Sequence, residues 1–352
     1  MNRTPIQVLV VDDSAVVRGL LAKALETDPA IRVAGTAMHG ELALQWLRRN
    51  AADVVVMDVE MPVMDGLTAL PLILEQFPHV QVVMASSLTY EGAETTVRAL
   101  ALGAAGCIAK PIGQSAGAAI ERVASELTPL VRALADRNAP VPAAPVIPRT
   151  PQIERNVPPK LLVIGASTGG PRALSVVLSG LPVDVPLPIL VVQHMPAMFT
   201  PMLARHLQKD TGRPCAEASH GGPLERGHTY VAPGDFHLEV GKRGERMVCL
   251  LNQGPQEHFC RPSVNPLFRS AANWYGSGVL AVMLTGMGDD GIEGTREVVA
   301  FKGRVVAQDQ ATSTVWGMPG AVVREGLAHD VLPLEAIAPA VLRLCLQEAI
   351  RR

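Results

Sequence analysis

Short apolar runs alternate with helix-patterned stretches over the first third of the chain. The strand-like runs are QVLVVDD, IRVAGTA, DVVVMDV, QVVMASS and CIAK, and helical patterns follow them at 14–26, 40–50, 66–76, 92–102 and 113–125. Runs rich in β-branched residues that alternate with helices are typical of a parallel sheet covered on both faces. The pattern therefore predicts a doubly wound α/β domain over residues 1–124.

The alternation stops and then resumes. The stretch APVPAAPVIPRTPQIERNVPP at 139–159 is too rich in proline for a helix or a sheet, and we expect a linker over 125–157. After it, strand-like runs return as LLVIGAS, PILVVQH, HTYVAPG, RMVCLL, VLAVMLT, RVVAQD and HDVLPL, with helical patterns at VNPLFRSAANWYG and 335–351. Residues 158–352 are therefore predicted to form a second doubly wound, Rossmann-like α/β domain.

Composition narrows the class of protein. A chain of 352 residues with 48% hydrophobic content can fill two cores, and its net charge of −2 argues against a general nucleic-acid or membrane-surface binder. The five cysteines are an odd number without a C-x-x-C pair, which is typical of reduced thiols in a cytosol. No apolar run approaches 18 residues. We expect a cytoplasmic, monomeric protein without membrane insertion.

Acidic residues cluster where the predicted strands of the first domain end. Asp12 and Asp13 follow the first strand, Asp58 ends the third, Ser86 ends the fourth and Lys110 closes the fifth. Because the carboxyl ends of parallel strands share one edge, three carboxylates would meet there and favour a hard divalent cation such as Mg²⁺. Asp58 would then accept a phosphoryl group, Lys110 would neutralise charge, and Ser86 would hydrogen-bond the phosphoryl oxygens.

Any one of these aspartates alone is better explained as a turn or cap residue. The interpretation as a phosphoryl-accepting site depends on the order in which the acids, the serine and the lysine follow successive strands. The segments VVDDSAVVR, VVVMDVEMPVMDGL, VVMASSLT, ALALGAAG and AKP resemble a response-regulator receiver domain. The resemblance implies a flavodoxin-like fold, phosphorylation at Asp58 and a histidine kinase of the chemotaxis type as phosphodonor. One departure is Cys107, which stands where receivers usually carry an aromatic residue that reports phosphorylation.

In the second domain, Ser167 lies in GASTGGP at a tight strand-to-helix turn. A serine there is either a nucleophile or a helix N-cap. A nucleophile needs a base, and His194 in VVQHMP ends the next predicted strand at the same sheet edge. The loop LTGMGDDG also follows a strand, so either Asp289 or Asp290 could orient the histidine.

That loop also has a competing interpretation. Gly286, Gly288 and Gly291 spell G-x-G-x-x-G, and Asp309 follows about 18 residues later, as in a dinucleotide-binding site. Two acids inside the loop would repel a pyrophosphate, whereas an acid beside an imidazolium is stabilising. The order serine, histidine, aspartate also differs from that of conventional α/β-hydrolases.

Six blocks of the second domain carry a resemblance to the chemotaxis protein-glutamate methylesterases. They are IGASTGGP, VVQHMPAMFT, HTYVAPGDFHLEV, RPSVNPLF, LTGMGDDG and VWGMPGAV. The resemblance implies Ser167 as nucleophile, His194 as base and Asp290 as orienting acid. It also implies that the backbone N–H of Met287 forms the oxyanion hole, with Thr168 as a neighbouring active-site residue.

Two residues of these blocks get no catalytic role from the resemblance. Asp289 is expected to be a surface or loop-capping group, and Asn265 stands where an acid is common. The implied reaction is hydrolysis of γ-glutamyl methyl esters on the cytoplasmic helices of methyl-accepting chemotaxis receptors, with glutamine deamidation as a second activity and no cofactor for the esterase. The unphosphorylated receiver is expected to block the active-site rim. The alternatives are a nicotinamide-dependent oxidoreductase and a non-hydrolytic receptor-binding scaffold.

Overall fold

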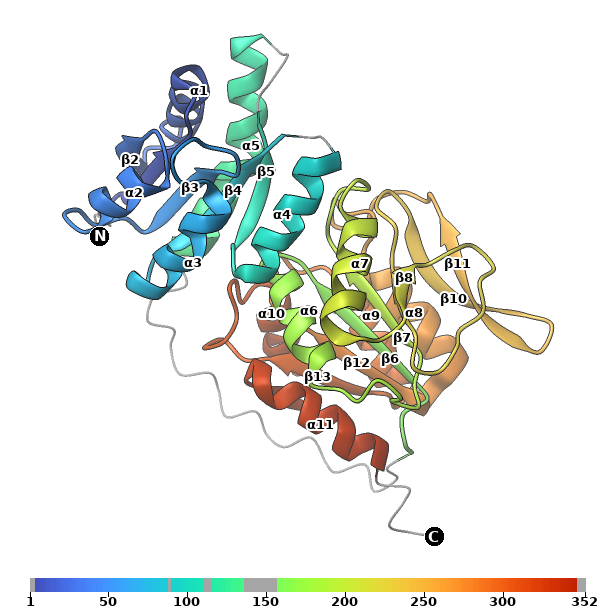
Figure 1. Ribbon diagram of the computed structural model, residues 1–352. Helices are drawn as coiled ribbons and strands as arrows, with labels where there is room; N and C mark the ends of the chain where they lie inside the picture. The colour runs from blue at the N-terminus through green and yellow to red at the C-terminus, as the bar shows by residue number, and fades with distance from the viewer. Residues whose placement is uncertain (1–3, 88–89, 111–114, 136–156, 347–352) are drawn as a thin grey trace. The chain divides into compact units, whose positions relative to one another are not determined.

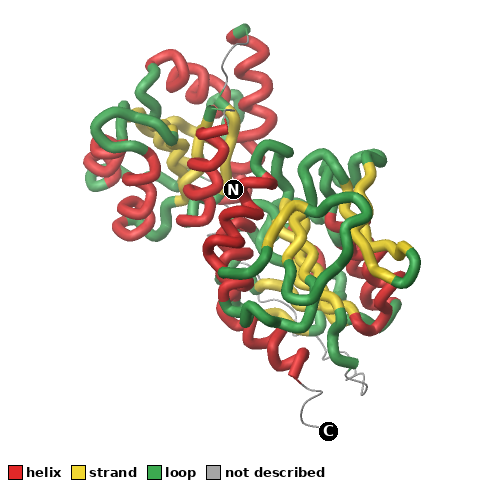
Figure 2. Tube along the Cα trace, turned by 45° about the vertical axis from the view of Figure 1, so that its right-hand side comes forward, coloured by secondary structure: helices red, strands yellow, loops and turns green. Residues whose placement is uncertain are grey.

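The computed structural model describes residues 4–87, 90–110, 115–135 and 157–346 (Figure 1). The chain divides into two compact units, Met1–Pro140 and Val141–Arg352. In Figure 2 each unit contains a layer of strands covered by helices, as the alternating sequence pattern predicts. None of the helices in the described parts of the chain is long and apolar enough to cross a bilayer.

The first unit is a five-stranded parallel sheet in the order β2-β1-β3-β4-β5. Its strands are built from buried β-branched runs, whose two faces are both covered by helices. The helices α1 and α5 contact one another, and α3 contacts both α2 and α4. The elements are β1 (Ile6–Val11), α1 (Ala15–Leu25), β2 (Ile31–Ala37), α2 (Gly40–Leu47), β3 (Val54–Asp58), α3 (Gly66–Gln76), β4 (Gln81–Ser86), α4 (Tyr90–Leu102), β5 (Gly106–Ala109) and α5 (Ala116–Ala135).

The last helix of this unit is longer than the sequence pattern predicts. The linker was expected to begin at residue 125, but α5 continues to Ala135, so that boundary was wrong. Pro129 lies inside the helix, and Leu127, Val131 and Leu134 are buried along one face. This continuous apolar face stabilises the helix across a proline that would otherwise end it. The proline-rich stretch that suggested the linker lies mostly outside the described residues.

The second unit is a seven-stranded parallel sheet in the order β14-β13-β12-β6-β7-β9-β8. Its first half consists of β6 (Leu161–Ala166), α6 (Gly170–Ser179), β7 (Ile189–Gln193), α7 (Thr200–Thr211), β8 (Cys215–Glu217), β9 (Thr229–Val231), β10 (His237–Arg243) and β11 (Arg246–Asn252). The second half consists of α8 (Val264–Tyr275), η2 (Gly276–Gly278), β12 (Val279–Met283), α9 (Ile292–Ala300), β13 (Arg304–Gln308), α10 (Met318–Arg324), β14 (Asp330–Leu332) and α11 (Leu334–Leu346).

Helices form two layers in this unit. The helix α6 contacts α7 and α11, while α9 contacts α8 and α10 (Figure 1). Alternate residues of the central strands, such as Leu161 and Val163 of β6, are buried with Phe268 of α8, Val298 of α9 and Val322 of α10. The two doubly wound parallel-sheet domains that the sequence predicts are therefore confirmed.

Two strands of the second unit, β8 and β10, were not predicted from the sequence. A third strand, β11, was predicted but lies outside the seven-stranded sheet. The apolar pattern did not indicate the short β8 or the longer β10. The strand β11 pairs with β10 in an antiparallel hairpin that is separate from the parallel sheet. This hairpin contacts α8, where the Ser270 hydroxyl oxygen accepts a hydrogen bond from the Val240 amide at 2.9 Å. A run of apolar residues indicates a buried strand but not the sheet to which it belongs.

Candidate functional site

Acids and a lysine meet at the carboxyl edge of the first sheet. Asp12 follows β1, Asp58 ends β3, and Lys110 follows β5. Both acids are buried, and the Lys110 Nζ lies 2.6 Å from Asp58 Oδ2 and 3.2 Å from Asp12 Oδ2. The structure thus brings together the residues that the sequence placed at three separate strand ends.

The net negative charge at this edge favours binding of a cation. The pKa of Asp58 is raised to about 6, mainly because the carboxyl group is buried. The Lys110 ammonium lowers this pKa, and the charge of Asp12 raises it. Oxygen atoms of Asp12, Asp13 and Asp58 all lie within 4.8 Å of one another. Lys110 offsets only one of these three charges. A donor set of carboxylate oxygens with excess negative charge fits Mg²⁺.

Ser86 occupies the end of β4, next to this cluster. The pairing of Asp58 with Ala85 places Ser86 one residue further along the neighbouring strand. Its hydroxyl lies 3.2 Å from the carbonyl oxygens of Ser87 and Gly92, to either of which it can donate. The hydroxyl would have to rotate in order to bond a phosphoryl oxygen on Asp58.

Three neighbouring strands of the second sheet deliver the predicted catalytic residues to one edge. Ser167 follows β6, His194 follows β7, and the loop 284–291 follows β12. In the sheet, β6 lies between β12 and β7, and Ala166 pairs with Gln193, so Ser167 and His194 continue from adjacent strands. The chain order reverses between β6 and β12, which is where open α/β sheets place their ligands.

The turn that carries Ser167 is fixed by its neighbours. The Ser167 amide donates to the Thr285 carbonyl at 3.0 Å, and Gln193 Nε2 donates to the Ser167 carbonyl at 2.8 Å. A side chain at Gly286 would bring its Cβ to 2.8 Å from the Ser167 Cβ. The glycine is therefore what allows the loop 284–291 to approach the serine so closely.

Asp290 is the acid that contacts His194. Its Oδ2 lies 2.7 Å from His194 Nε2, and the carboxylate also accepts hydrogen bonds from the Ser263 hydroxyl at 2.6 Å and the Val264 amide at 2.7 Å. Asp290 is only 2% exposed. Asp289 instead points to His258, with Oδ1 at 2.8 Å from Nδ1. The contact with His194 is therefore made by Asp290, the acid that the resemblance implies, and not by its neighbour Asp289.

Electrostatics favour an ion pair between these residues. Burial works against the charged imidazole, but the hydrogen bond to Asp290 and the contact with Cys260 raise the pKa of His194 to about 9. Burial likewise works against the Asp290 carboxylate, while His194, Ser263 and the Val264 amide together lower its pKa. Val264 begins α8, so the partial positive charge of a helix N-terminus adds to this stabilisation.

Because Asp290 contacts Nε2, Nδ1 is the ring nitrogen left to accept a proton. Cys260 Sγ lies 3.6 Å from this Nδ1. Within the described residues, no hydrogen bond joins the Ser167 hydroxyl to His194. The two residues follow directly from a paired position of adjacent strands, and catalytic hydrogen bonds often shorten only when substrate binds.

The predicted oxyanion donor is held in the loop beside Ser167. The Gly286 carbonyl accepts from the amides of Gly317 (3.0 Å) and Met318 (2.9 Å), and the Gly286 amide donates to the Val315 carbonyl at 3.0 Å. Across the described part of the chain, the Met287 amide has no hydrogen-bonding partner, so it can bind an oxyanion. Thr168 contributes its carbonyl, which accepts from the Thr285 hydroxyl at 2.9 Å.

The acid expected for a dinucleotide site is engaged elsewhere. Asp309 follows β13, and its Oδ1 accepts from the Thr312 amide at 3.0 Å and the Thr312 hydroxyl at 2.6 Å. This side chain closes its own turn instead of facing the glycine loop. Together with the burial of Asp290 against His194, this removes the support for a nucleotide cradle.

Several supporting residues were missed in the sequence. Ser263, Gln193, Thr285 and Cys260 bond or contact the residues discussed above. Only Ser263 has a recognisable signal, because it precedes a helical pattern and forms the N-cap of α8. The others are ordinary strand-end or loop residues whose role depends on tertiary contacts.

The two sheet edges define the class: a two-domain α/β protein with an acidic phosphoacceptor-type site and a serine-hydrolase-type site. Residues 162–341 match the family model described as CheB methylesterase, and residues 8–120 match the response regulator receiver domain. The chain therefore belongs to the CheB methylesterase family.

Relatives with printed names cover nearly the whole chain. Protein-glutamate methylesterase/protein-glutamine glutaminase 1 of Rhodospirillum rubrum is 45% identical and covers 96% of this chain and 95% of its own. Its namesake from Paramagnetospirillum magneticum is 46% identical and covers 96% of each chain. The crystal structure of the Thermotoga maritima CheB methylesterase catalytic domain matches with a TM-score of 0.52 at 41% identity, covering 53% of this chain and all of that one.

Proposed function

We propose that this chain is a phosphorylation-activated protein-glutamate methylesterase that acts on the cytoplasmic helices of methyl-accepting chemotaxis receptors. The observation that carries the proposal is the buried His194–Asp290 pair at 2.7 Å on the sheet edge where Ser167 emerges. The names of the whole-length relatives support the substrate class. The protein would work in the cytoplasm and receive its phosphoryl group from a histidine kinase of the chemotaxis type.

In the proposed reaction, Ser167 attacks the carbonyl of a γ-glutamyl methyl ester while His194 Nδ1 takes the hydroxyl proton. Asp290 stabilises the imidazolium that forms, and the Met287 amide binds the oxyanion of the tetrahedral intermediate. The proton returns from His194 to the departing methanol. Water then attacks the acyl-enzyme by the same route and releases glutamate.

Glutamine deamidation follows from the same chemistry. An amide carbonyl would form the same γ-glutamyl acyl-enzyme, with ammonia in place of methanol as the leaving group. The relatives' names include protein-glutamine glutaminase, which supports this second activity. No additional residue is needed, because His194 protonates either leaving group.

Control of the esterase is assigned to Asp58. Its carboxylate would be the acceptor, Lys110 holds it by a contact of 2.6 Å, and Ser86, which ends the neighbouring strand, would bond the incoming phosphoryl oxygens. Asp12, Asp13 and Asp58 would hold Mg²⁺, which neutralises charge on the phosphoryl group when it is bound. Phosphorylation would shift the population from an inhibited to an active form of the esterase.

Acetyl phosphate with Mg²⁺ is expected to stimulate methanol release from methylated receptor membranes by the wild-type protein, and not by Asp58→Ala. The alanine has no carboxylate to phosphorylate, whereas the hydrolytic domain is unchanged. The stimulation can be about tenfold or more, because a shift of a few kcal/mol in the population is enough. Rates are measured as methanol released over time with and without the phosphodonor.

Two outcomes would contradict different parts of the proposal: the control through Asp58 and the esterase activity. Equal stimulation of both proteins would exclude control through Asp58. Absence of methanol from the wild type, with and without phosphodonor, would instead exclude the esterase assignment itself.

The esterase should become faster as the pH rises from 7 to about 9. His194 must be neutral to take the Ser167 proton, but its pKa is raised to about 9, so the imidazolium dominates below that value. We expect kcat/KM to increase by up to about tenfold per pH unit below 9 and then level off. A pH profile of the receiver-independent reaction, with a small glutamate γ-methyl ester as substrate, measures this.

Cys260→Ala provides the internal comparison. Because the contact with Cys260 contributes to the raised pKa of His194, its removal should move the rising limb of the profile to lower pH. A wild-type profile that is flat between pH 7 and 9 would show that His194 is not the titrating base.

A further inference from the structure

The tight turn at 257–260 lies beside the catalytic histidine. Its ends are joined by two backbone hydrogen bonds, from the Glu257 amide to the Cys260 carbonyl at 3.2 Å and from the Cys260 amide to the Glu257 carbonyl at 2.9 Å. The two central residues, His258 and Phe259, have φ values of 49° and 61°. Glycine or asparagine is favoured in such positions, so a histidine followed by a phenylalanine costs conformational energy.

Contacts around His258 hold this strained conformation. Nδ1 lies 2.8 Å from Asp289 Oδ1, and Nε2 lies 3.1 Å from Glu293 Oε2. Glu293 Oε2 also accepts from Asn265 Nδ2 at 2.8 Å. Burial works against a charged ring, but Asp289 and Glu293 together raise the pKa of His258. The two residues without a role in the sequence analysis, Asp289 and Asn265, therefore belong to one network that fixes the turn.

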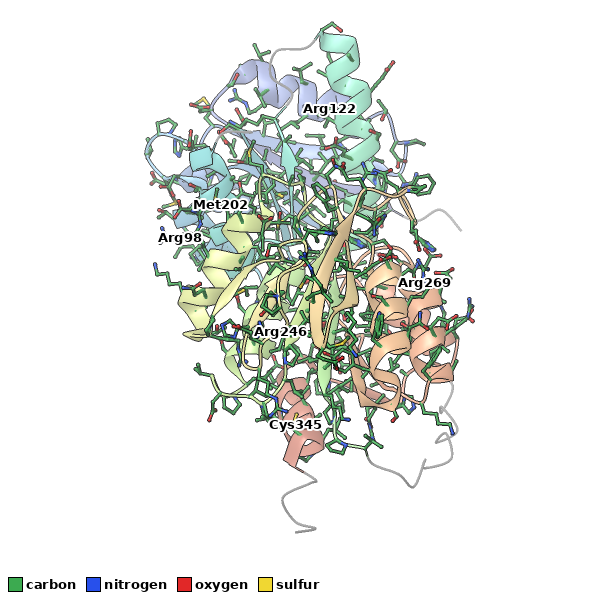
Figure 3. The ribbon with its side chains drawn as sticks, turned by 90° about the vertical axis from the view of Figure 1, so that its right-hand side faces the viewer. Arg98, Arg122, Met202, Arg246, Arg269 and Cys345 are labelled. Carbon is green, nitrogen blue, oxygen red and sulfur yellow. The ribbon has the colours of Figure 1, made fainter. Side chains whose placement is uncertain are left out.

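The flanks of the turn are also anchored. Glu257 pairs with Arg269 of α8 at 2.6 Å, and Arg269 is labelled in Figure 3. On the other side, Arg261 pairs with Asp235 at 2.6 Å and donates to the Gly254 carbonyl at 2.9 Å. The turn is thus tied to the domain on both sides, so its conformation is fixed before any partner binds.

What this arrangement presents to solvent is Phe259. Its side chain is 96% exposed, although its neighbour Cys260 is within 3.6 Å of His194 Nδ1. Two further exposed apolar side chains come from the loops that follow β12 and β7: Met287 is 39% exposed and Met198 is 38% exposed. We call these three residues the apolar rim. Phe259 precedes Cys260, Met287 carries the proposed oxyanion amide, and Met198 follows His194 by four residues, so each belongs to a segment that also supplies a group of the proposed site. Large apolar side chains exposed on such segments indicate a binding surface for a partner.

We propose that the apolar rim recognises the substrate helix, with Phe259 packing against an apolar side chain one helical turn from the esterified glutamate. This inference rests on the proposed function. A glutamyl ester that reaches Ser167 brings its own helix to the rim, and residues three or four positions away lie on the same helix face. The partner is therefore an amphipathic helix that carries apolar residues at that spacing from the target glutamate.

A preformed turn that presents an aromatic side chain lowers the entropy cost of binding a helix. Because the backbone of the turn is already fixed, little backbone freedom is lost at Phe259 when a helix binds, and the aromatic surface that becomes buried adds to affinity. The rim would affect a helical substrate but not an isolated ester, because a single capped glutamate γ-methyl ester has no neighbouring turn. This difference separates recognition from chemistry.

The test compares Phe259→Ala with wild type on two substrates. For methylated receptor membranes, we expect KM to rise by about tenfold with kcat changed less than about threefold. For a capped glutamate γ-methyl ester, we expect both constants to stay within about twofold of wild type. Phe259→Leu, which keeps an apolar side chain, should recover most of the loss on receptor membranes.

Phe301→Ala is the matched control. It removes the same atoms from a 42% exposed phenylalanine of the same domain, at the far end of α9 from the catalytic loop, and should leave both substrates unaffected. If Phe259→Ala matches wild type on receptor membranes, or if both substrates are impaired equally, the recognition role is wrong. If wild-type protein hydrolyses neither substrate, the proposed function fails instead.

Discussion

Ser167→Ala is expected to abolish methanol release from methylated receptor membranes, with a loss in kcat of about 10⁴-fold or more. Alanine leaves no nucleophile for the acyl-enzyme, although His194 and Asp290 remain paired. The backbone groups of residue 167 bond the Thr285 carbonyl and the Gln193 side-chain amide and do not involve the hydroxyl, so the turn should persist. Methanol release at matched protein concentration measures the loss.

This variant also separates the esterase from a binding scaffold. Thermal unfolding should occur within a few degrees of wild type, because a partly exposed hydroxyl is removed from a turn that is held by backbone bonds. Binding to receptor membranes should be retained. A variant that still releases methanol at more than a tenth of the wild-type rate would show that Ser167 is not the nucleophile.

The sequence predicts the sheet edges well because the strands are continuous buried runs. In a doubly wound fold, any polar residue that follows such a run lies at the carboxyl edge of the sheet. That rule placed Asp58 and His194 at the sheet edges, while Ser167 was singled out by the glycine-rich turn that follows its strand, and the observed pairing of Ala166 with Gln193 shows why the rule works. Strand periodicity therefore carries most of the information about the position of the site.

Long-range contacts account for what the sequence could not give. Asp289 and Asp290 are adjacent and chemically identical, and the structure separates them because α8 directs Ser263 and the Val264 amide to only one of them. Cys260 lies far from His194 in sequence and shows no motif of its own. The helix α5 extends past Pro129 because its buried face continues, which a proline rule applied to the sequence alone does not anticipate.

Asp290→Asn is expected to lower kcat by about 10⁴-fold while the protein stays folded. Asparagine has nearly the same shape and can still accept from the Ser263 hydroxyl, but it carries no charge to stabilise the His194 imidazolium. It can also donate to the ring, which favours a tautomer that is unable to accept the serine proton. Hydrolysis of a small glutamate γ-methyl ester, followed across pH 6 to 10, measures both effects.

The pH profile distinguishes loss of charge from loss of shape. Without the carboxylate, the pKa of His194 should fall from about 9, because the hydrogen bond and the charge of Asp290 both raise it. The residual activity of Asp290→Asn should therefore level off at lower pH than that of wild type. Asp309→Asn is the matched control, since this acid follows β13 of the same sheet but closes its own turn through Thr312, and we expect its activity within about twofold of wild type. If both variants lose activity equally, or if the Asp290→Asn profile keeps the wild-type midpoint, then Asp290 does not act through the charge of His194, and the chemistry proposed for this sheet edge must be revised.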